Sequence, residues 1–308
     1  MIAFGCSITD SDTYERCARP GIERAAEPDS EILAFQMAGS IFRSYNVILD
    51  AAAQLEDLEA VALVHQDAEI VSTDFCTTIR DALSDPDVGV VGCVGAIGVR
   101  SIAWWEGSVT WASFTHRYSE LGGGDLPALS WKHDEMPAYA RTGEVDTVDG
   151  FVMVLSPWVV RNVRFDESLG ALHGYDFDFC LQVRAAGRKV VTADFKAVHH
   201  HGLDLVRNKE GWIEAHIKVA EKWTGKMPGV GVEGGDWEQR ARRAEAEAAV
   251  ARAEAVSAML QSQASTKQLD ALVDELTGST SWRYTKPLRE LNIRLKDRLP
   301  GRRNGRPA

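Results

Sequence analysis

Short apolar runs alternate with helix-like segments through the first 95 residues of this 308-residue chain, and this alternation restricts the possible folds more than any other feature. Four runs are predicted to be strands: 2–8, 31–38, 60–66 and 88–95. Three segments between them are predicted to be helices: 12–26, 40–55 and 73–83. The runs do not alternate between polar and apolar residues, as is typical of strands covered on both faces. The sequence therefore predicts an α/β fold with a mostly parallel, doubly wound sheet.

The middle of the chain is less regular before the pattern returns. Residues 96–143 contain several tryptophans and three consecutive glycines at 122–124. These aromatic side chains could stack on a sugar or base ring, or they could cover a core. Strand character returns at 144–160, a helix is expected at 175–187, where Gly187 is a natural stop, and a further strand is expected at 189–200.

Composition narrows the class of protein. The apolar fraction of 45% and charged fraction of 26% are ordinary for a globular protein, and no apolar run approaches the roughly 20 residues that span a bilayer. The first ten residues do not resemble a signal peptide, so we expect a cytoplasmic protein. The five cysteines are an odd set without a C-x-x-C pair, which argues against a disulfide framework and a zinc ribbon.

A seven-residue repeat begins at Trp237 and changes the character of the chain. Its predicted seam consists mainly of small residues and ends in leucines: Trp237, Ala241, Ala244, Ala248, Ala251, Ala255, Ala258, Ser262, Ser265, Leu269, Leu272 and Leu276. This pattern is typical of a coiled coil, which would allow a homo-oligomer, although a single alanine-rich helix fits it too. We therefore predict an α/β domain at 1–225, a linker at 226–236, a coiled-coil helix at 237–277 and a separate tail at 278–308.

The tail is basic although the protein is acidic. The net charge of the chain is −11, yet residues 282–308 contain nine Lys or Arg against two acidic residues. An acidic body is not typical of a nucleic-acid-binding protein. Leucines at helical spacing (288, 291, 295 and 299) predict an amphipathic segment that could lie on an anionic membrane surface. A solvated tail, or a helix packed on the acidic body, would also account for the pattern.

Four polar clusters lie at or just beyond predicted strand ends: His65 with Asp67, Asp149 with Gly150, Asp176 with Asp178, and the histidines 199–201. In open α/β sheets such positions meet in one crevice, where ligands bind. Side chains two apart on an extended segment point the same way, so His65 and Asp67 are expected to face one space. A carboxylate oxygen from Asp67 and a nitrogen from His199 or His200 would suit Mn²⁺ or Mg²⁺.

Several segments of residues 1–225 resemble the family-2 glycosyltransferases of the GT-A fold, in the bacterial subgroup with HQD in place of DxD. The similar segments are "SIFRSYNVILDAAA", "VHQDAEI", "VDGFVMVL", "LHGYDFDFCLQVRAAGRKVV" and "AVHHHG". Two residues depart from the family pattern in the fourth segment: Tyr175 stands where Glu is usual, and Gln182 where Arg is usual. His65 similarly stands in the place of the first carboxylate of the metal motif.

This resemblance implies an inverting glycosyltransferase that moves a sugar from a nucleotide-diphosphate donor to a hydroxyl of a glycan or lipid-linked acceptor. Asp176 aligns with the family's catalytic base, whereas Asp178 is expected to be structural. Asp67 with His199 or His200 would hold the cation that neutralises the diphosphate leaving group. The implied substrate-binding residues are Cys6, Ser7, Gln36, Asn46, His65, Asp149 and Gly150.

Other classes of function are weighed against this one. A metal-dependent nucleotide-sugar hydrolase would use the same site with water as acceptor. A non-catalytic scaffold that recruits partners through the coiled coil is a third hypothesis, for which the replacement of Asp by His65 is the only support. No G-x-G-x-x-G motif is present, which disfavours a dinucleotide enzyme. If the acceptor is lipid-linked, the protein is expected at the inner face of the cell membrane, held by its tail.

Overall fold

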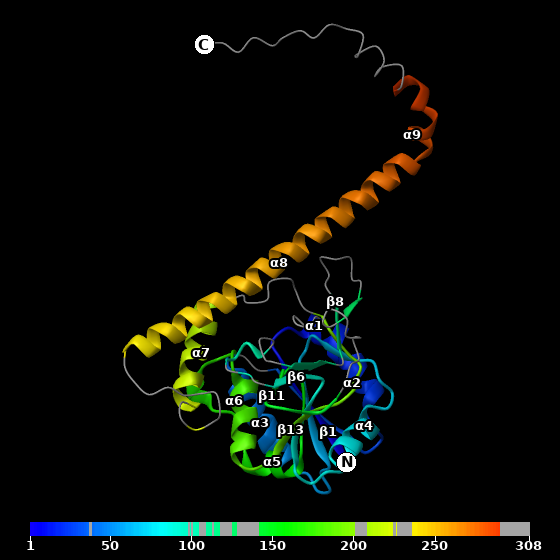
Figure 1. Ribbon diagram of the computed structural model, residues 1–308. Helices are drawn as coiled ribbons and strands as arrows, with labels where there is room; N and C mark the ends of the chain where they lie inside the picture. The colour runs from blue at the N-terminus through cyan, green and yellow to red at the C-terminus, as the bar shows by residue number, and fades with distance from the viewer. Residues whose placement is uncertain are drawn as a thin grey trace. The chain divides into compact units, whose positions relative to one another are not determined.

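The computed structural model of the chain describes residues 1–36, 39–97, 99, 101–104, 109–112, 114–117, 125–127, 142–200, 208–223, 226 and 236–289 (Figure 1). The chain forms two compact units, Met1–Ser257 and Ala258–Ala308. The first unit contains the sheets and the candidate site. The second contains the end of one long helix and a short helix after it, together with the basic tail, whose residues 290–308 lie outside the described residues.

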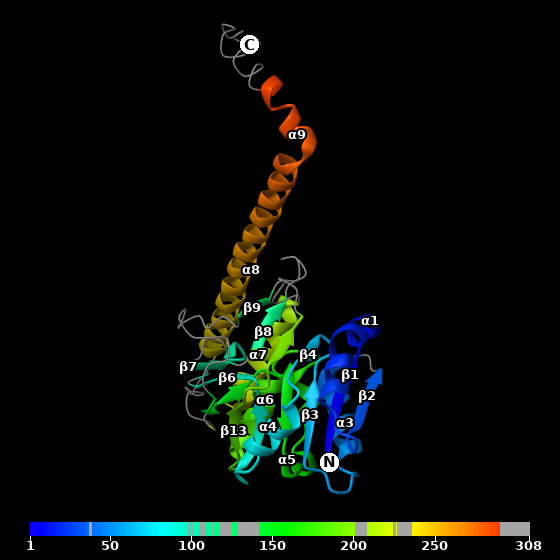
Figure 2. The same cartoon turned by 90° about the vertical axis from the view of Figure 1, so that its right-hand side faces the viewer.

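A seven-stranded sheet is the centre of the first unit (Figure 2). Its spatial order is β10 (Glu144–Val145), β13 (Lys189–Thr192), β5 (Val88–Gly92), β12 (Val152–Leu155), β3 (Ala60–Val64), β1 (Ile2–Ile8) and β2 (Glu31–Gln36). Five strands run in the same direction, and only β12 and β10 run against them. The predicted α/β class and the mostly parallel sheet are therefore confirmed.

Helices cover both faces of this sheet (Figure 1). One face packs against α3 (Ile41–Ala52), α5 (Pro157–Asn162) and α6 (Tyr175–Ala185), and the other against α2 (Arg19–Ala25) and α4 (Phe75–Ala82). Successive side chains of strand β3 point to opposite faces of the sheet. Val61 and Leu63 enter the core on the first face, while Ala62 and Val64 enter the core on the second. Because both faces are buried there, the central strands β3, β5 and β12 are apolar throughout.

Two short sheets extend the structure. One contains β11 (Thr147–Val148), β6 (Val94–Ile97) and β7 (Val109–Ala112), and the other β4 (Ala68–Ile70), β14 (Ala197–His199), β8 (Phe114–Arg117) and β9 (Asp125–Pro127). The runs 88–95 and 189–200 were each expected as one strand, but each is divided between the main sheet and a short one. Near the second division Lys196 has a φ of 49°, a left-handed conformation that no regular strand contains.

The remaining helices complete the two units. The first predicted helix is divided into α1 (Ser11–Thr13), a π-helical turn (Tyr14–Ala18) and α2. A 3₁₀ turn (Glu167–Leu169) precedes α6, and α7 (Lys209–Trp223) follows the sheets. The long helix α8 (Asp236–Gly278) and then α9 (Thr280–Tyr284) end the described part of the chain. None of the helices in the described ranges is both long and apolar enough to cross a membrane.

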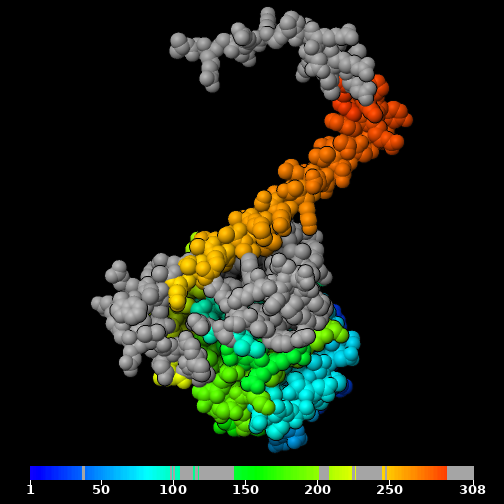
Figure 3. All heavy atoms as spheres, in the orientation of Figure 1, coloured from blue at the N-terminus to red at the C-terminus, as the bar shows by residue number. Residues whose placement is uncertain are grey.

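Helix α8 does not begin a separate unit, as the predicted linker at 226–236 implied. Its early residues Ala246, Ala249, Val250 and Ala253 belong to the first core, so the first unit extends past residue 225 to Ser257. The predicted coiled-coil seam lies on a different face of the helix, which is exposed at positions 248, 251 and 255. This part of α8 lies at the molecular surface in Figure 3. All five cysteines are buried and free.

Candidate active site

The candidate site lies where β1 and β3 end and β12 begins. Strands β1 and β3 are parallel, and β12 pairs with β3 in the opposite direction, with Val152 beside Val64. The backbone N–H of His65 donates to the carbonyl of Phe151 at 2.9 Å. Residues that precede β12 therefore share an edge with residues that follow β3. The reversed direction of β12 is what brings Asp149 and Gly150 to the site.

Three side chains of this edge form a group that could bind a metal ion: His65, Asp67 and His199. Asp67 Oδ1 lies 3.8 Å from His65 Nδ1 and 3.7 Å from His199 Nε2. His199 comes from β14, which pairs with β4 so that His199 lies opposite Ala68. The ring of His199 stacks on Phe151 with a centroid distance of 4.4 Å, and this contact fixes its orientation. Histidines 134 positions apart in the chain thus converge on one carboxylate.

The donor set fits a divalent cation. Asp67 Oδ1 is shielded from solvent and receives no hydrogen bond from the described residues, which is costly unless something else satisfies it. A cation between this oxygen and the two imidazole nitrogens would do so. One carboxylate and two imidazoles leave coordination positions for water or phosphate oxygens. Imidazole nitrogen is a softer ligand than oxygen, so the set favours Mn²⁺ over Mg²⁺.

Gln66, between the two proposed ligands, supports the site. Its Oε1 accepts from the backbone N–H groups of Thr9 and Asp10 at 2.8 and 2.9 Å, and its Nε2 donates to Thr9 Oγ1 at 2.9 Å. These bonds fix the turn after β1 against the end of β3. The neighbours of Gln66 in the chain, His65 and Asp67, then face the space where the cation would bind.

Of the two histidines predicted as alternative ligands, His199 belongs to that group and His200 does not. Successive residues of an extended segment point in opposite directions, so only one of two neighbouring histidines can face Asp67. His200 Nε2 lies 2.9 Å from Glu69 Oε2 instead, while its backbone N–H donates to the carbonyl of Asp67 at 2.8 Å. Glu69 also lies within 3.4 Å of Arg117, so His200 belongs to a neighbouring ionic cluster.

Asp176 lies in the first turn of α6, beside the site. Gly174, with a φ of 78°, reverses the chain so that the helix can begin at Tyr175. Asp176 Oδ2 accepts from the backbone N–H of Gly150 at 3.1 Å, and Oδ1 accepts from its neighbour Phe177 at 2.9 Å. Burial, and to a lesser degree the nearby carboxylate of Asp149, raises the pKa of Asp176 to about 7. A carboxylate with this pKa can exchange a proton near neutral pH.

Asp149 is held in place by two hydrogen bonds. Trp104 Nε1 donates to its Oδ2 at 2.8 Å, and the backbone N–H of Phe151 donates to its Oδ1 at 3.1 Å. These bonds fix the direction of the Asp149 carboxylate beside Asp176. Trp104 was expected either to stack on a ligand or to cover a core, and it contacts the site through its N–H.

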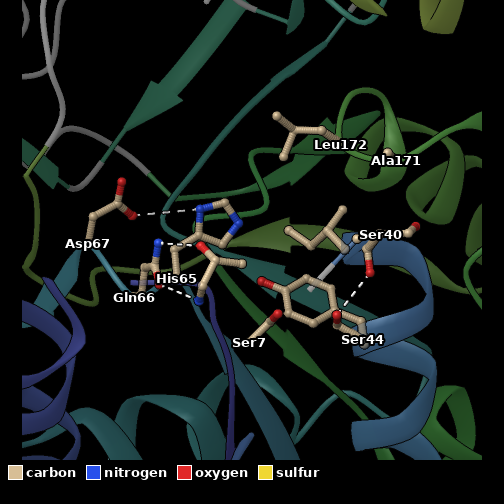
Figure 4. A pocket seen from close by; sticks show the side chains of 12 residues that line it. Ser7, Ser40, Ser44, His65, Gln66, Asp67, Ala171 and Leu172 are labelled. Carbon is tan, nitrogen blue, oxygen red and sulfur yellow. Dashed lines mark hydrogen bonds and ion pairs between the residues drawn. The ribbon is translucent and has the colours of Figure 1, made fainter. Parts of the chain in front are cut away.

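Two cavities meet at His65, Gln66 and Asp67. The first, of about 380 Å³, lies between the ends of β1 and β3 and the start of α3. Figure 4 shows Ser44 of α3, and Ser40 just before that helix, across this cavity from His65 and Asp67. The second, of about 660 Å³, has walls that contain the cation group, Asp149 and Asp176, besides Trp104 and Trp212. A ligand that fills both cavities would pass directly over Asp67.

Four predicted substrate-binding residues have different outcomes. Ser7 lines the first cavity. Cys6 is fully buried in the second core, because its side chain points to the opposite face of β1. Gln36 is exposed and donates to Ser11 Oγ at 2.8 Å, away from both cavities. Asn46 exchanges hydrogen bonds with the backbone of Phe165 at 2.8 and 2.9 Å, so it attaches α3 to the segment before α6.

The structure also places the remaining residues that were predicted at or near the site. His65, predicted to bind substrate, belongs to the cation group. Gly150 approaches the site through its backbone, and Asp149 through its carboxylate. Asp178 is fully buried, where it accepts from Trp223 Nε1 at 2.7 Å and pairs with Lys222 at 2.8 Å, so it has the structural contacts expected of it.

Sequence reasoning missed two tyrosines. Tyr45 of α3 lines the first cavity, and Tyr175 of α6 lines the second. The hydroxyl of Tyr175 lies 2.6 Å from His65 Nε2. Tyr175 stands where the family pattern has Glu, and this departure was the sequence signal that could have identified it.

The sequence of the chain matches a known protein family. A family described as "Glycosyltransferase like family" matches residues 3–220, and the chain belongs to this family. It is also 29% identical over 203 residues to the streptomycin biosynthesis protein StrF of Streptomyces griseus. That match covers 65% of this chain and 66% of the relative, so the chain spans just under two thirds of the relative's length.

Solved structures show weaker likenesses. GalNAc-T7 with UDP, GalNAc and Mn²⁺ has a TM-score of 0.48 and 8% identity, over 80% of this chain and 54% of that chain. The mannosyltransferase PcManGT of Pyrobaculum calidifontis, in complex with GDP-Man and Mn²⁺, has a TM-score of 0.45 and 15% identity, over 97% of this chain and 88% of that chain. Both likenesses are too weak to bear on the site.

Proposed function

We propose that the protein is a metal-dependent, inverting glycosyltransferase that moves a sugar from a nucleotide-diphosphate donor to an acceptor hydroxyl. One observation carries the proposal: a group fit for a cation, His65–Asp67–His199, lies on the wall of the same cavity as Asp176, a carboxylate with a pKa of about 7. Family membership supports the class of reaction. The cation and the base are the two requirements of such a transfer.

The donor would occupy the first cavity and extend toward Asp67. Hydroxyl groups of Ser7, Thr9 and Ser40 line this cavity and can hydrogen-bond a ribose or a phosphate. Its apolar lining includes Ile41 and the exposed Leu172, which suit the face of a base. When bound at His65, Asp67 and His199, the cation supplies positive charge that stabilises the diphosphate leaving group.

Asp176 would accept the proton of the acceptor hydroxyl. Its carboxylate is held by two backbone N–H groups, so its direction is fixed before the acceptor arrives. Loss of the proton leaves the oxygen free to attack the sugar carbon from the face opposite the diphosphate, which inverts the configuration there. Burial, and to a lesser degree Asp149, keeps the pKa of Asp176 high enough for this role.

The acceptor is proposed to be a glycan or a lipid-linked hydroxyl, bound in the second cavity. Trp104 and Trp212 line that cavity and offer aromatic surface to a sugar ring. StrF is named for streptomycin biosynthesis, so small soluble acceptors belong in the screen beside glycans. We also propose a cytoplasmic location, membrane attachment through the basic tail, and association of chains through the predicted seam of α8.

The test is a screen of UDP- and GDP-sugars with the full chain, Mn²⁺ and a panel of acceptors. Nucleoside diphosphate release is measured with and without acceptor, and the anomeric configuration of the product is determined by NMR. We expect acceptor-dependent release and an inverted product. Equal release without any acceptor would show a hydrolase instead, and a retained configuration would refute the role of Asp176. Absence of donor binding across the screen would favour the scaffold hypothesis.

A further inference from the structure

The two residues that depart from the family pattern beside the metal site contact each other. His65 stands in place of a carboxylate and Tyr175 in place of a glutamate, and His65 Nε2 lies 2.6 Å from the Tyr175 hydroxyl. The other ring nitrogen, Nδ1, is the one that faces Asp67, at 3.8 Å. The imidazole is therefore held at one nitrogen by Tyr175 and presents the other to the proposed cation.

Tyr175 is well placed to fix this ring. It is only 6% exposed, and its ring makes edge contacts with Phe42 and Tyr45 at centroid distances of 6.0 and 5.7 Å. Its backbone starts α6 immediately after Gly174, whose left-handed conformation sets the direction of the first turn. The hydroxyl is thus positioned by a packed core and a helix start, rather than by a mobile loop.

Gly150 makes room for the hydroxyl. A Cβ atom added at Gly150 would lie 2.1 Å from Tyr175 Oη and 2.5 Å from two of its ring carbons. Such contacts are impossible without moving the tyrosine. The backbone N–H of the same glycine donates to Asp176 at 3.1 Å. Gly150 therefore lets the chain approach α6 closely enough to contact both the proposed base and the residue that holds His65.

The chemistry of imidazole gives this contact a role. A neutral imidazole carries one proton, and only its other nitrogen can bind a metal. If Nδ1 faces the cation, the proton is on Nε2 and needs an acceptor, which the Tyr175 oxygen provides. Histidines that bind metals almost always donate their second N–H to such a partner, which sets both tautomer and orientation.

We propose that Tyr175 is a positioning residue that holds His65 with Nε2 protonated and Nδ1 directed at the cation. This inference rests on the proposed metal site. It assigns to Tyr175 no contact with the cation or the substrates. Tyr175 thereby pre-organises His65 as a ligand. A neutral imidazole, unlike the carboxylate that His65 replaces, has only one nitrogen available for a metal at a time.

The matched experiment compares Tyr175→Phe with Tyr45→Phe in the full chain. Each variant removes one buried hydroxyl from the same aromatic cluster and keeps the ring. The Tyr45 hydroxyl has no hydrogen-bond partner among the described residues, so its loss should leave Mn²⁺ affinity unchanged. Loss of the Tyr175 hydroxyl should weaken Mn²⁺ binding about 10- to 100-fold. Affinity is measured from the electron paramagnetic resonance signal of free Mn²⁺, without nucleotide or turnover.

A second readout is specific for the tautomer. Nitrogen-15 NMR of the histidine side chains, with diamagnetic Mg²⁺ bound, should show His65 protonated at Nε2 in the wild type and less uniformly so in Tyr175→Phe. If Tyr175→Phe does not fold, Gly150→Ala displaces the same hydroxyl and should weaken Mn²⁺ binding as well.

The outcomes separate this inference from the metal site itself. If the wild type does not bind Mn²⁺, the metal site and the inference both fail. If the wild type binds but Tyr175→Phe binds equally well, or both tyrosine variants lose affinity alike, only the role of Tyr175 is overturned. Protonation of His65 at Nδ1 in the Mg²⁺ form would also overturn it.

Discussion

The carboxylate of Asp176 accepts a hydrogen bond from the backbone N–H of Gly150, and this 3.1 Å contact joins the start of α6 to the residue before β12. It brings together two residues 26 positions apart in sequence. The contact orients the proposed base without using a charged partner, so the proton affinity of Asp176 is set mainly by burial and by Asp149.

Replacing Asp176 by Asn should remove transfer while leaving donor binding intact. Asn cannot take the acceptor proton, and loss of a general base typically lowers the rate about 10²–10⁴-fold. The measurements are kcat for transfer and the Kd for the donor with Mn²⁺. An active Asp176→Asn enzyme together with an inactive Asp178→Asn enzyme would mean that the two roles are reversed.

Transfer should increase with pH through about 7, because Asp176 must be deprotonated to act as a base and its pKa is raised to about 7. Removal of the neighbouring charge in Asp149→Asn should lower this pKa, so the rising limb should shift to lower pH. The profile of kcat at saturating Mn²⁺ and donor measures both. A profile that is flat from about pH 5.5 to 8.5, or unshifted in the variant, would contradict the assignment.

Replacing Asp178 by Asn should destabilise the fold. The carboxylate is fully buried and pairs with Lys222. Its loss leaves Asp166 as the remaining ion-pair partner of that lysine among the described residues. Breaking a buried ion pair costs about 3 kcal/mol or more in the free energy of unfolding. Urea unfolding measures this cost, with Asp166→Asn, in the more exposed half of the same cluster, as the control. Equal costs in the two variants would show that the burial of Asp178 is unimportant.

The full chain should sediment with anionic vesicles more than a chain that ends at Thr280 does. Each basic residue near the surface contributes about 1 kcal/mol at most, and salt weakens this attraction. Binding should therefore disappear with neutral vesicles or at high salt. Equal sedimentation of the two chains would refute the tail as a membrane anchor.

Local patterns in the sequence were enough to predict the sheet. Strand β1 has the predicted bounds, 2–8, because its side chains are apolar on both faces and flanked by a polar turn. The division of 189–200 into β13 and β14 was not predicted, because the break depends on the left-handed backbone at Lys196, a residue type that gives no such signal. The direction of β12 depends on its neighbours in space, which periodicity does not report.

The site was predicted in part for similar reasons. Asp67 and His65 follow a buried strand, so their spacing alone placed them on one side. The choice of His199 over His200 needed the pairing of β14 with β4, which sets which side chain faces Asp67. Asn46 resembled a substrate-binding residue but binds the backbone of Phe165, 119 residues away. Such contacts are determined by packing between elements that are distant in the chain.

The most direct test of the account is the effect of Mn²⁺ on nucleoside diphosphate binding, measured by calorimetry for the wild type and for Asp67→Ala. Glu69→Gln is the matched control, because Glu69 lies two residues away and pairs with His200, outside the cation group. We predict that Mn²⁺ strengthens UDP or GDP binding in the wild type and in Glu69→Gln, and has no effect in Asp67→Ala although that variant remains folded. Wild-type Mn²⁺ dependence in Asp67→Ala would contradict the metal site and the mechanism built on it.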